Sequence, residues 1–339
     1  MRFFRTKGGK ITLVVFSVLF LLVGSGMCFV DGLFSGFNHV DRNSFGVDSG
    51  FNVNEEDESV DPNLPVNNDP SAMQFGSGSI ISDSNILNIL LIGSDTRGNE
   101  KYGRSDSMMI VSINKKTKQV KLTSLLRDMY VKIDGLQDNR INVAYGHGGP
   151  KLLADTIEKN FRVKLDNYVM VDFESFKKLI NMVGGVQITL TQAEANEINN
   201  HPGTYFTNGE TQRVKAGLNT LNGAGALAYS RIRHIDSDFN RTQRQRTVIE
   251  ALLKSMKSSS AGTIWSVVSE MRQYVQTDLT NSQLFDLSMN SLSYLSNPLQ
   301  QLSILASGAY QSENIRGMAV LVPNIEKNKA LIWKFIYNR

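Results

Sequence analysis

The sequence predicts an α/β fold in which helices cover both faces of a sheet, preceded by one transmembrane helix. Three observations predict this architecture: an uncharged run of twenty residues near the N-terminus, several short apolar runs of strand length, and helical patterns between some of those runs. With 339 residues, of which 41% are hydrophobic, the chain can bury one large core or two smaller ones.

The first element is the uncharged run at residues 11–30. As a helix it spans about 30 Å, the thickness of a bilayer core. Four basic residues precede it, and Asp31 and Asp41 follow it, a distribution that favours a cytoplasmic N-terminus and an extracellular remainder. We therefore expect a cytoplasmic tail over residues 1–10 and an uncleaved, single-pass type II anchor in the cell membrane. A cleaved signal peptide is the alternative, because the small residues at 24–26 suit a cleavage site.

The second element, residues 31–84, is rich in Gly, Ser, Asn and Asp and has no sustained apolar period, so we expect a disordered extracellular stalk. It holds ten acidic residues and one basic residue, which leaves residues 85–339 with a net charge of +9. This basic part favours an anionic partner. The only cysteine, Cys28, lies in the apolar run, which excludes disulfides and cysteine metal sites.

Residues 85–339 are expected to form one domain, because no break in composition divides them. Apolar, partly β-branched runs predict strands at 86–92, 108–113, 120–126, 168–173 and 186–190. Between them, Pro150 is expected to start a helix over 151–161, and a second helix covers 174–183 before a Gly-Gly pair ends it.

The rest of the chain predicts a loop, four helices and two more apolar runs. The loop is expected over 194–218, the helices over 223–229 with Asn222 as cap, 241–256, 282–296 and 328–337, and the apolar runs at 302–306 and 319–322.

Charged residues stand at the ends of two predicted strands. Asp95 follows the first strand, and Asp106 precedes the second. Two carboxylates at adjacent strand ends can hold Mg²⁺, or Mn²⁺, beside a phosphorylated substrate. Arg97 and Arg104 lie close to both in sequence and either neutralise the aspartates or face the substrate. Surface salt bridges are the alternative interpretation of all four residues.

Further arginines gather at the end of the third strand and within residues 229–246. This set consists of Arg127, Arg231, Arg233, Arg241, Arg244 and the neighbouring Gln245. The last three occupy positions i, i+3 and i+4 of a helix stripe that becomes apolar at Val248, so we expect them to be buried. Buried guanidinium groups need anionic partners, either a charged ligand or a carboxylate such as Asp236 or Asp238.

A helix that begins near Asn240 also presents free N–H groups and a partial positive charge, which suit phosphate. Arginine forks match pairs of phosphate oxygens, and the arginines outnumber what a monophosphate requires, so we infer a pyrophosphate. A solvated basic face or a nucleic-acid patch is the alternative. The extracellular location and the lack of interleaved aromatic residues other than Phe239 argue against nucleic acid.

In order and spacing, the motifs GSDTR, GRSDSMMIVSIN, SLLRDMY, INVAYGHGGP, YVMVDF, GGVQITL and the arginine-rich run at 231–246 resemble the LytR-CpsA-Psr family. The resemblance covers residues 85–255 and implies a mixed central sheet between layers of helices. It also implies a phosphotransferase that moves an anionic glycopolymer, of the teichoic acid or capsule type, from a polyprenyl-pyrophosphate carrier to the muramic acid 6-hydroxyl of peptidoglycan.

The resemblance further implies roles for single residues. Asp95 and Asp106 match the magnesium-binding aspartates, and either is a candidate for the base. The pyrophosphate-binding set is Arg104, Arg127, Arg231, Arg233, Arg241 and Gln245, with Arg97 and Arg244 as adjacent candidates. Asp106, Arg127 and Arg233 are the residues expected at the catalytic centre.

Three other functions remain as alternatives: a polyprenyl-pyrophosphate hydrolase, a membrane-anchored transcriptional regulator and a polymer-binding module. A cytoplasmic tail of only ten residues speaks against the regulator, and a binding module has no need of paired metal aspartates. Transferase and hydrolase differ only in whether an acceptor is required.

Overall fold

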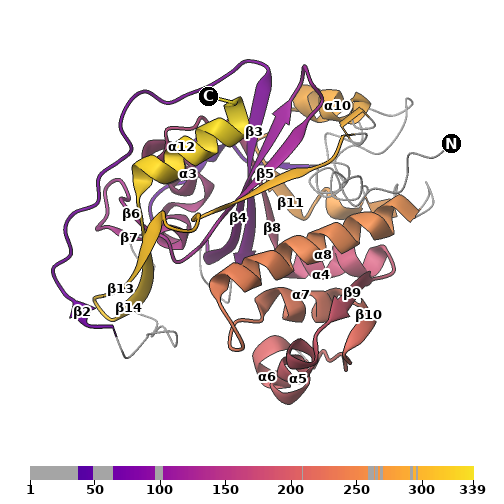
Figure 1. The fold of residues 1–339 in the computed structure, drawn as a ribbon. Coiled ribbons are helices and arrows are strands. Elements are labelled where there is room, and N and C mark those ends of the chain that lie inside the picture. Colours follow the sequence, from indigo (N-terminus) through magenta and orange to yellow (C-terminus); the bar gives the residue numbers. More distant parts are fainter. Residues whose placement is uncertain are drawn as a thin grey trace. The chain divides into compact units, whose positions relative to one another are not determined.

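In the computed structural model, the chain forms two compact units. Figure 1 shows the fold with its helices and strands labelled. The described residues are 37–48, 64–95, 102–207, 209–258, 263, 266–267, 270–290, 293–294 and 297–339. The first unit contains the residues up to 39, 118–120 and 171–300, and the second contains 40–117, 121–170 and 301–339. Both units include residues of the region 85–339, which was expected to be one domain, and each unit is assembled from segments that are distant in sequence.

The second unit is built on strands in the order β8-β3-β4-β5-β12. Their bounds are Asn167–Asp172 for β8, Ile86–Asp95 for β3, Arg104–Asn114 for β4, Val120–Leu125 for β5 and Gln300–Ile304 for β12. β3 and β4 are antiparallel, and every residue of 86–90 and of 108–113 is buried. Because successive side chains point to opposite faces of a sheet, protein covers both faces of these two strands, as the sequence predicts.

Helix α3 (Ile141–Phe161) contacts β4 and also α12 (Ile325–Tyr337) within this unit. It consists of two helical segments, because Gly148 and Gly149 depart from helical geometry. Pro150 opens the second segment, as predicted, since proline fits the first turn of a helix but not its interior.

Short strands complete the second unit. β2 (Val66–Asn67), β13 (Tyr310–Ile315) and β14 (Met318–Pro323) form a sheet in the order β14-β13-β2, and β6 (Tyr130–Val131) pairs with β7 (Asn139–Arg140).

Parts of the predicted stalk, residues 31–84, belong to this unit. β2 pairs in parallel with β13, and Arg42, in a short 3-10 helix, η2 (Arg42–Ser44), donates a hydrogen bond to a backbone carbonyl. The backbone N–H and the hydroxyl of Ser77 bond to Glu326 at 2.8 and 3.0 Å. These residues are therefore ordered, contrary to the expected disorder. The prediction missed them because backbone and polar side-chain contacts produce no apolar period in the sequence.

The first unit consists mainly of helices. Its elements are β1 (Asn38–His39), α4 (Phe173–Met182), β9 (Val186–Leu190), α5 (Gln192–Asn200), α6 (Pro202–Tyr205), β10 (Gly217–Leu221), α7 (Gly223–Arg231), α8 (Asp238–Ser258), β11 (Val275–Thr277) and α10 (Asn281–Met289). β9 and β10 are antiparallel, and β1 lies parallel to β11. One hydrophobic cluster, which includes Leu179, Ile188 and Val248, joins α4, β9 and α8.

The loop expected over 194–218 contains most of α5, all of α6 and the start of β10. The polar sequence of α5 hides its helical period. Thr191 and Glu194 nevertheless form a capping box, a helix-start signal that is visible in the sequence.

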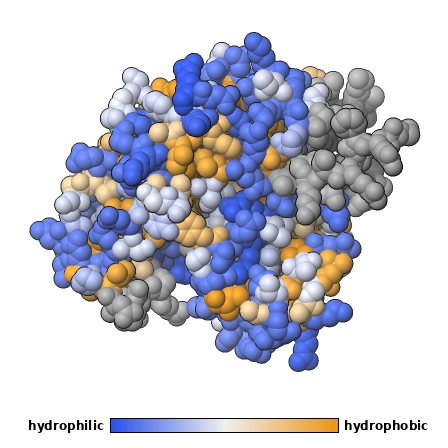
Figure 2. Space-filling view, viewed as in Figure 1, coloured by the Kyte–Doolittle hydropathy of each residue, from blue (hydrophilic) through white to orange (hydrophobic). Residues whose placement is uncertain are grey.

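The predicted fold class, α/β with a central mixed sheet, is confirmed, because both parallel and antiparallel strand pairs occur in it. In the part of the chain that the structure describes, no helix combines the length and the apolar character needed to cross a membrane. The predicted anchor at 11–30 and the stalk residues 31–36 and 49–63 lie outside that part. The face shown in Figure 2 is mostly hydrophilic, with separate hydrophobic patches.

Candidate functional site

Both predicted metal ligands lie at the same end of the β3–β4 pair. Asp95, the last residue of β3, stands opposite Arg104, the first residue of β4. The register shifts by one residue just after Gly93, and Asp106 is the extra residue in β4. Such a β-bulge takes a residue out of the regular pairing and re-aims its side chain. The structure thus brings Asp95, Arg104 and Asp106 to one end of the sheet.

Arg127 joins this group from the turn that follows β5. Its Nη1 donates to Oδ1 of Asp106 at 2.8 Å, and its Nε lies 3.3 Å from Oδ1 of Asp128. The same oxygen of Asp128 is 3.5 Å from Nη1 of Arg140. The side chains of Asp106 and Arg127 are 20% and 12% exposed. Aspartate and arginine side chains therefore alternate in a mostly buried row of four residues.

Two members of this row of four side chains were not predicted as site residues. Asp128 follows Arg127 directly, so the Arg-Asp doublet at a strand end is a signal that the sequence contains. Arg140 arrives through the short β6–β7 pair, in which it stands opposite Tyr130. No sequence spacing indicates that approach. Arg97, predicted beside this group, lies outside the described residues.

The donor set suits a divalent cation shared between Asp95 and Asp106. Three arginines, 104, 127 and 140, balance three aspartates, 95, 106 and 128, so a pyrophosphate placed here would need an added positive charge. Mg²⁺ is usually held by one or two protein carboxylates together with substrate phosphates and water. Across the described ranges, no group of three or more His, Cys, Asp or Glu side chains could hold a metal by itself. The residues fit a cation that the substrate helps to bind.

The first unit holds the other predicted residues. Arg231 ends α7, and its Cζ lies 5.6 Å from the ring centroid of Phe173, the first residue of α4. Arg233 is half-buried in the following turn, where its carbonyl accepts from the N–H of Asp236 at 3.3 Å. Arg231 and Arg233 do not share an extended segment, as the alternation with Ile232 had suggested, because the helix continues through Arg231.

Arg244 is buried, and protein groups surround its guanidinium. Nε donates to Glu194 Oε1 at 2.7 Å, and Nη1 donates to the Ile232 carbonyl at 3.1 Å and to Asp236 Oδ1 at 3.0 Å. Nη2 also bonds to Asp236. Burial lowers the pKa of Arg244, but the bonds to Asp236 and Glu194 outweigh it and raise the pKa above its usual value.

Asp236, one of the carboxylates expected to pair with a buried arginine, therefore binds Arg244. The structure differs here from the prediction that Arg244 contacts pyrophosphate, because carboxylates and a carbonyl already occupy its nitrogens. Arg244 instead ties α8 to the turn over 232–236 that carries Arg233.

Arg241 and Gln245 lie on the same stripe of α8. Arg241 is 4% exposed, Gln245 is half-buried, and Val248 and Leu252 below them are buried. The predicted burial is confirmed for Arg241 and Arg244, whereas Gln245 is only half-buried. The predicted residues thus form two groups, with Asp95, Arg104, Asp106 and Arg127 in the second unit and Arg231, Arg233, Arg241, Arg244 and Gln245 in the first.

Known proteins are similar to this chain in sequence and in fold. The model of the LytR_cpsA_psr family matches residues 47–332. A relative from Bacillus mycoides (strain KBAB4), named polyisoprenyl-teichoic acid–peptidoglycan teichoic acid transferase TagU, is 35% identical over 240 residues, which are 69% of this chain and 74% of the relative.

Two solved structures share the fold. TagT bound to LIIa-WTA matches with a TM-score of 0.60 and 25% identity, over 79% of this chain and 98% of that one. The LytR-CPS2A-psr family protein YwtF (TagT) with bound octaprenyl pyrophosphate lipid matches with a TM-score of 0.57 and 21% identity, over 79% and 99%.

Proposed function

The chain belongs to the LytR_cpsA_psr family, and from this premise we propose that it is a transferase that moves a lipid-linked anionic glycopolymer onto peptidoglycan. The relative named as a teichoic acid–peptidoglycan transferase supports both the reaction class and the teichoic acid type of polymer. A capsule-type polymer would present the same chemistry at the linkage.

The contact between Arg127 and Asp106 carries this proposal at the level of residues. It places a guanidinium beside a carboxylate at the end of two strands, in a largely buried position. A planar guanidinium suits phosphate oxygens, and burial strengthens the attraction. The solved relative with bound octaprenyl pyrophosphate lipid has the same fold, which agrees with a polyprenyl-pyrophosphate carrier.

Asp95 and Asp106 would hold Mg²⁺, which when bound supplies positive charge against the phosphate oxygens. Arg104 and Arg127 would bind the pyrophosphate and offset charge as it develops. Arg231, Arg233, Arg241 and Gln245 remain members of the predicted pyrophosphate-binding set. One of the two aspartates would accept the proton of the acceptor hydroxyl.

The reaction is a substitution at phosphorus. The acceptor hydroxyl of the glycan attacks the phosphorus attached to the first sugar of the polymer, and its proton passes to the base. The bond from that phosphorus to the bridging oxygen breaks, and polyprenyl phosphate leaves with the electron pair. In line with the predicted anchor, we place this reaction on the outer side of the cell membrane.

The test uses the full chain in detergent with a polyprenyl-pyrophosphate-linked oligosaccharide and peptidoglycan fragments. We expect a sugar–phosphate–glycan linkage that requires Mg²⁺ and that Asp106→Asn lowers at least about a hundredfold, as loss of a group acting at the transition state does. Asp155→Asn is the matched control, because Asp155 is a half-buried aspartate that pairs with Lys151 on α3.

Release of polyprenyl phosphate without a linkage, even with acceptor present, would show a hydrolase. Equal activity of the Asp106 and Asp155 variants would contradict the assigned site, and activity undiminished by a chelator would contradict the metal.

A further inference from the structure

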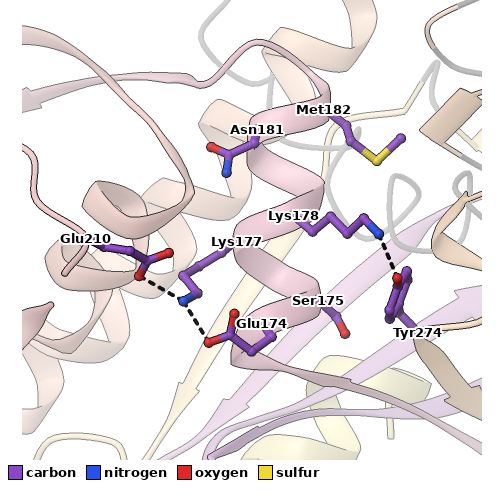
Figure 3. Close-up of a pocket in the computed structure, with 8 residues that line it drawn as sticks. All are labelled: Glu174, Ser175, Lys177, Lys178, Asn181, Met182, Glu210 and Tyr274. Carbon is purple, nitrogen blue, oxygen red and sulfur yellow. Dashed lines mark hydrogen bonds and ion pairs between the residues drawn. The ribbon is translucent and has the colours of Figure 1, made fainter. Parts of the chain in front are cut away.

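A groove follows one face of α4 in the first unit (Figure 3). Its floor comes from residues 174–182 of that helix, its walls are Glu210 and Tyr274, and it encloses about 600 Å³. Lining residues 174, 178, 181 and 182 recur at helical spacing, so they share one face. At about 1.5 Å per residue, the floor is roughly 12 Å long, which suits a short stretch of an extended polymer.

Ser175 adds a buried hydroxyl to the lining of this groove. Ser175 is 2% exposed, and its Oγ makes no hydrogen bond to any described residue. Its backbone N–H is held by Asp172, the N-cap of α4. In Figure 3, the hydroxyl lies on the side of α4 that faces Tyr274. A buried hydroxyl without a partner costs about 1–3 kcal/mol, and a ligand that supplies the hydrogen bond removes this cost.

The lysines of the groove are already neutralised. Lys177 is buried, and its Nζ lies 2.7 Å from Glu174 and 2.9 Å from Glu210. These three residues together carry one net negative charge. The groove therefore does not attract a phosphate, unlike the arginine groups described above.

The second lysine is joined to the wall of the groove. Nζ of Lys178 bonds to Glu270 at 2.5 Å and to the hydroxyl of Tyr274 at 2.6 Å, and it lies 4.2 Å from the centroid of that ring. Tyr274 is nevertheless 37% exposed. It presents an aromatic surface beside fixed donors and acceptors.

We propose that this groove binds an uncharged stretch of glycan. Sugar hydroxyls both donate and accept, which matches a lining where ammonium, amide, carboxylate and hydroxyl groups alternate. The C–H face of a sugar packs on an exposed ring such as Tyr274. A peptide would require apolar side-chain pockets, and Met182 and Tyr274 are the two apolar or aromatic residues among those that line this groove.

The identity of the glycan rests on the proposed function. The transferred polymer is anionic, whereas the groove has no positive charge to spare, so the neutral sugars of the acceptor strand fit it better. The groove also begins at Glu174, one residue after the Phe173 ring over which Arg231 lies. One end of the groove is thereby next, along α4, to the residue whose ring contacts Arg231, a member of the predicted pyrophosphate-binding set.

The test measures binding of N-acetylglucosamine tetramer to the full chain by titration calorimetry, without lipid or metal. We expect Tyr274→Ala and Ser175→Ala each to weaken binding about tenfold, the effect of losing roughly 1.4 kcal/mol. Phe285→Ala is the control for the first, because Phe285 is also an exposed ring. Ser112→Ala is the control for the second, because its buried hydroxyl also has no hydrogen-bond partner among the described residues.

Since no step of the transfer reaction enters this measurement, its outcome is separate from that of the proposed function. Saccharide binding that both test variants leave unchanged would overturn the site. Absence of saccharide binding, or binding of a stem peptide or polyglycerol phosphate in its place, would overturn the ligand class even if the chain is an active transferase.

Discussion

The arginines of the two groups differ in what holds them. Arg127 contacts Asp106 with one terminal nitrogen and Asp128 with Nε, whereas three nitrogens of Arg244 bond to protein oxygens. The sequence presents both as arginines near a predicted site and does not separate them. The difference arises from Glu194, which lies fifty residues away in sequence and reaches Arg244 only through the fold.

Arg244→Ala is expected to lower the free energy of unfolding by about 3 kcal/mol, because it leaves the buried carboxylate of Glu194 without its cation. Arg213→Ala, at an exposed arginine of the same unit, should change it by less than about 0.5 kcal/mol. Urea unfolding of the two variants measures both values. A stable Arg244→Ala protein with reduced affinity for lipid pyrophosphate would instead identify Arg244 as a ligand.

Glu326 gives a pH dependence with a definite sign. Its bonds to Lys329 and to the Ser77 N–H lower the pKa of this carboxyl from 4.5 to about 2. A carboxylate whose pKa is lower in the folded state than in the unfolded chain stabilises the fold fully at pH values above the unfolded pKa. This contribution is lost as the pH falls from about 4.5 towards 2.

Because the Glu326 side chain is 55% exposed, we expect Glu326→Gln to cost only about 1 kcal/mol at pH 7. Urea unfolding at pH 7, 5, 4 and 3 should show the gap between wild type and variant narrowing at acid pH. A gap that is constant over this range would mean that the charge of Glu326 plays no part.

At the scale of elements, the most predictable were those with a strong apolar period. The strands at 86–92, 108–113 and 120–126 were predicted because burial on both faces demands continuous apolar residues. Helix α5 was missed because its surface is polar and only its cap marks it. The β-bulge that takes Asp106 out of the regular strand pairing depends on how two strands align. No single run of residues reveals that alignment.

The kink inside α3 depends on Gly149. Its φ of +58 is unfavourable for other residues, and an added Cβ would stand 3.0 Å from Phe45 and 3.2 Å from Tyr102. We expect Gly149→Ala to destabilise the protein by about 2–3 kcal/mol, from backbone strain and overpacking together.

Gly135→Ala is the matched control for Gly149→Ala, because Gly135 also has a positive φ but nothing within 4 Å of an added Cβ. It should cost only the strain, about 1 kcal/mol. Thermal unfolding of both variants separates the two contributions, and equal losses would show that the contact with the aromatic rings is unimportant.

At the scale of the whole molecule, the sequence predicted the core of the fold and the position of its charged residues, but not how far the fold extends towards the N-terminus. Residues 37–48 and 64–84 were assigned to a stalk because their contacts are polar and local patterns are absent. The sequence also did not predict that the chain forms two compact units, each built from segments that are distant in sequence. No change in composition marks the boundaries of these segments.

A chain that begins at residue 85 should therefore be less stable than one that begins at residue 37. It lacks the β2 partner of β13 and the Ser77 contacts of Glu326 and Lys329. We expect a fall in melting temperature of several degrees, which corresponds to about 1–2 kcal/mol in a protein of this size. Identical melting curves would show that the N-terminal segments contribute nothing to folding.

The pairing of β1 with β11 also limits how far the first unit can stand from the bilayer. If the helix over 11–30 crosses the membrane as predicted, only residues 31–37 separate its end from β1, which begins at Asn38. A fully extended chain covers at most about 3.5 Å per residue, so this tether reaches roughly 25 Å. The long acidic segment further along the chain adds nothing to that height. With that anchor, the unit would stay within about 25 Å of the surface from which a membrane-embedded lipid carrier would present its head group.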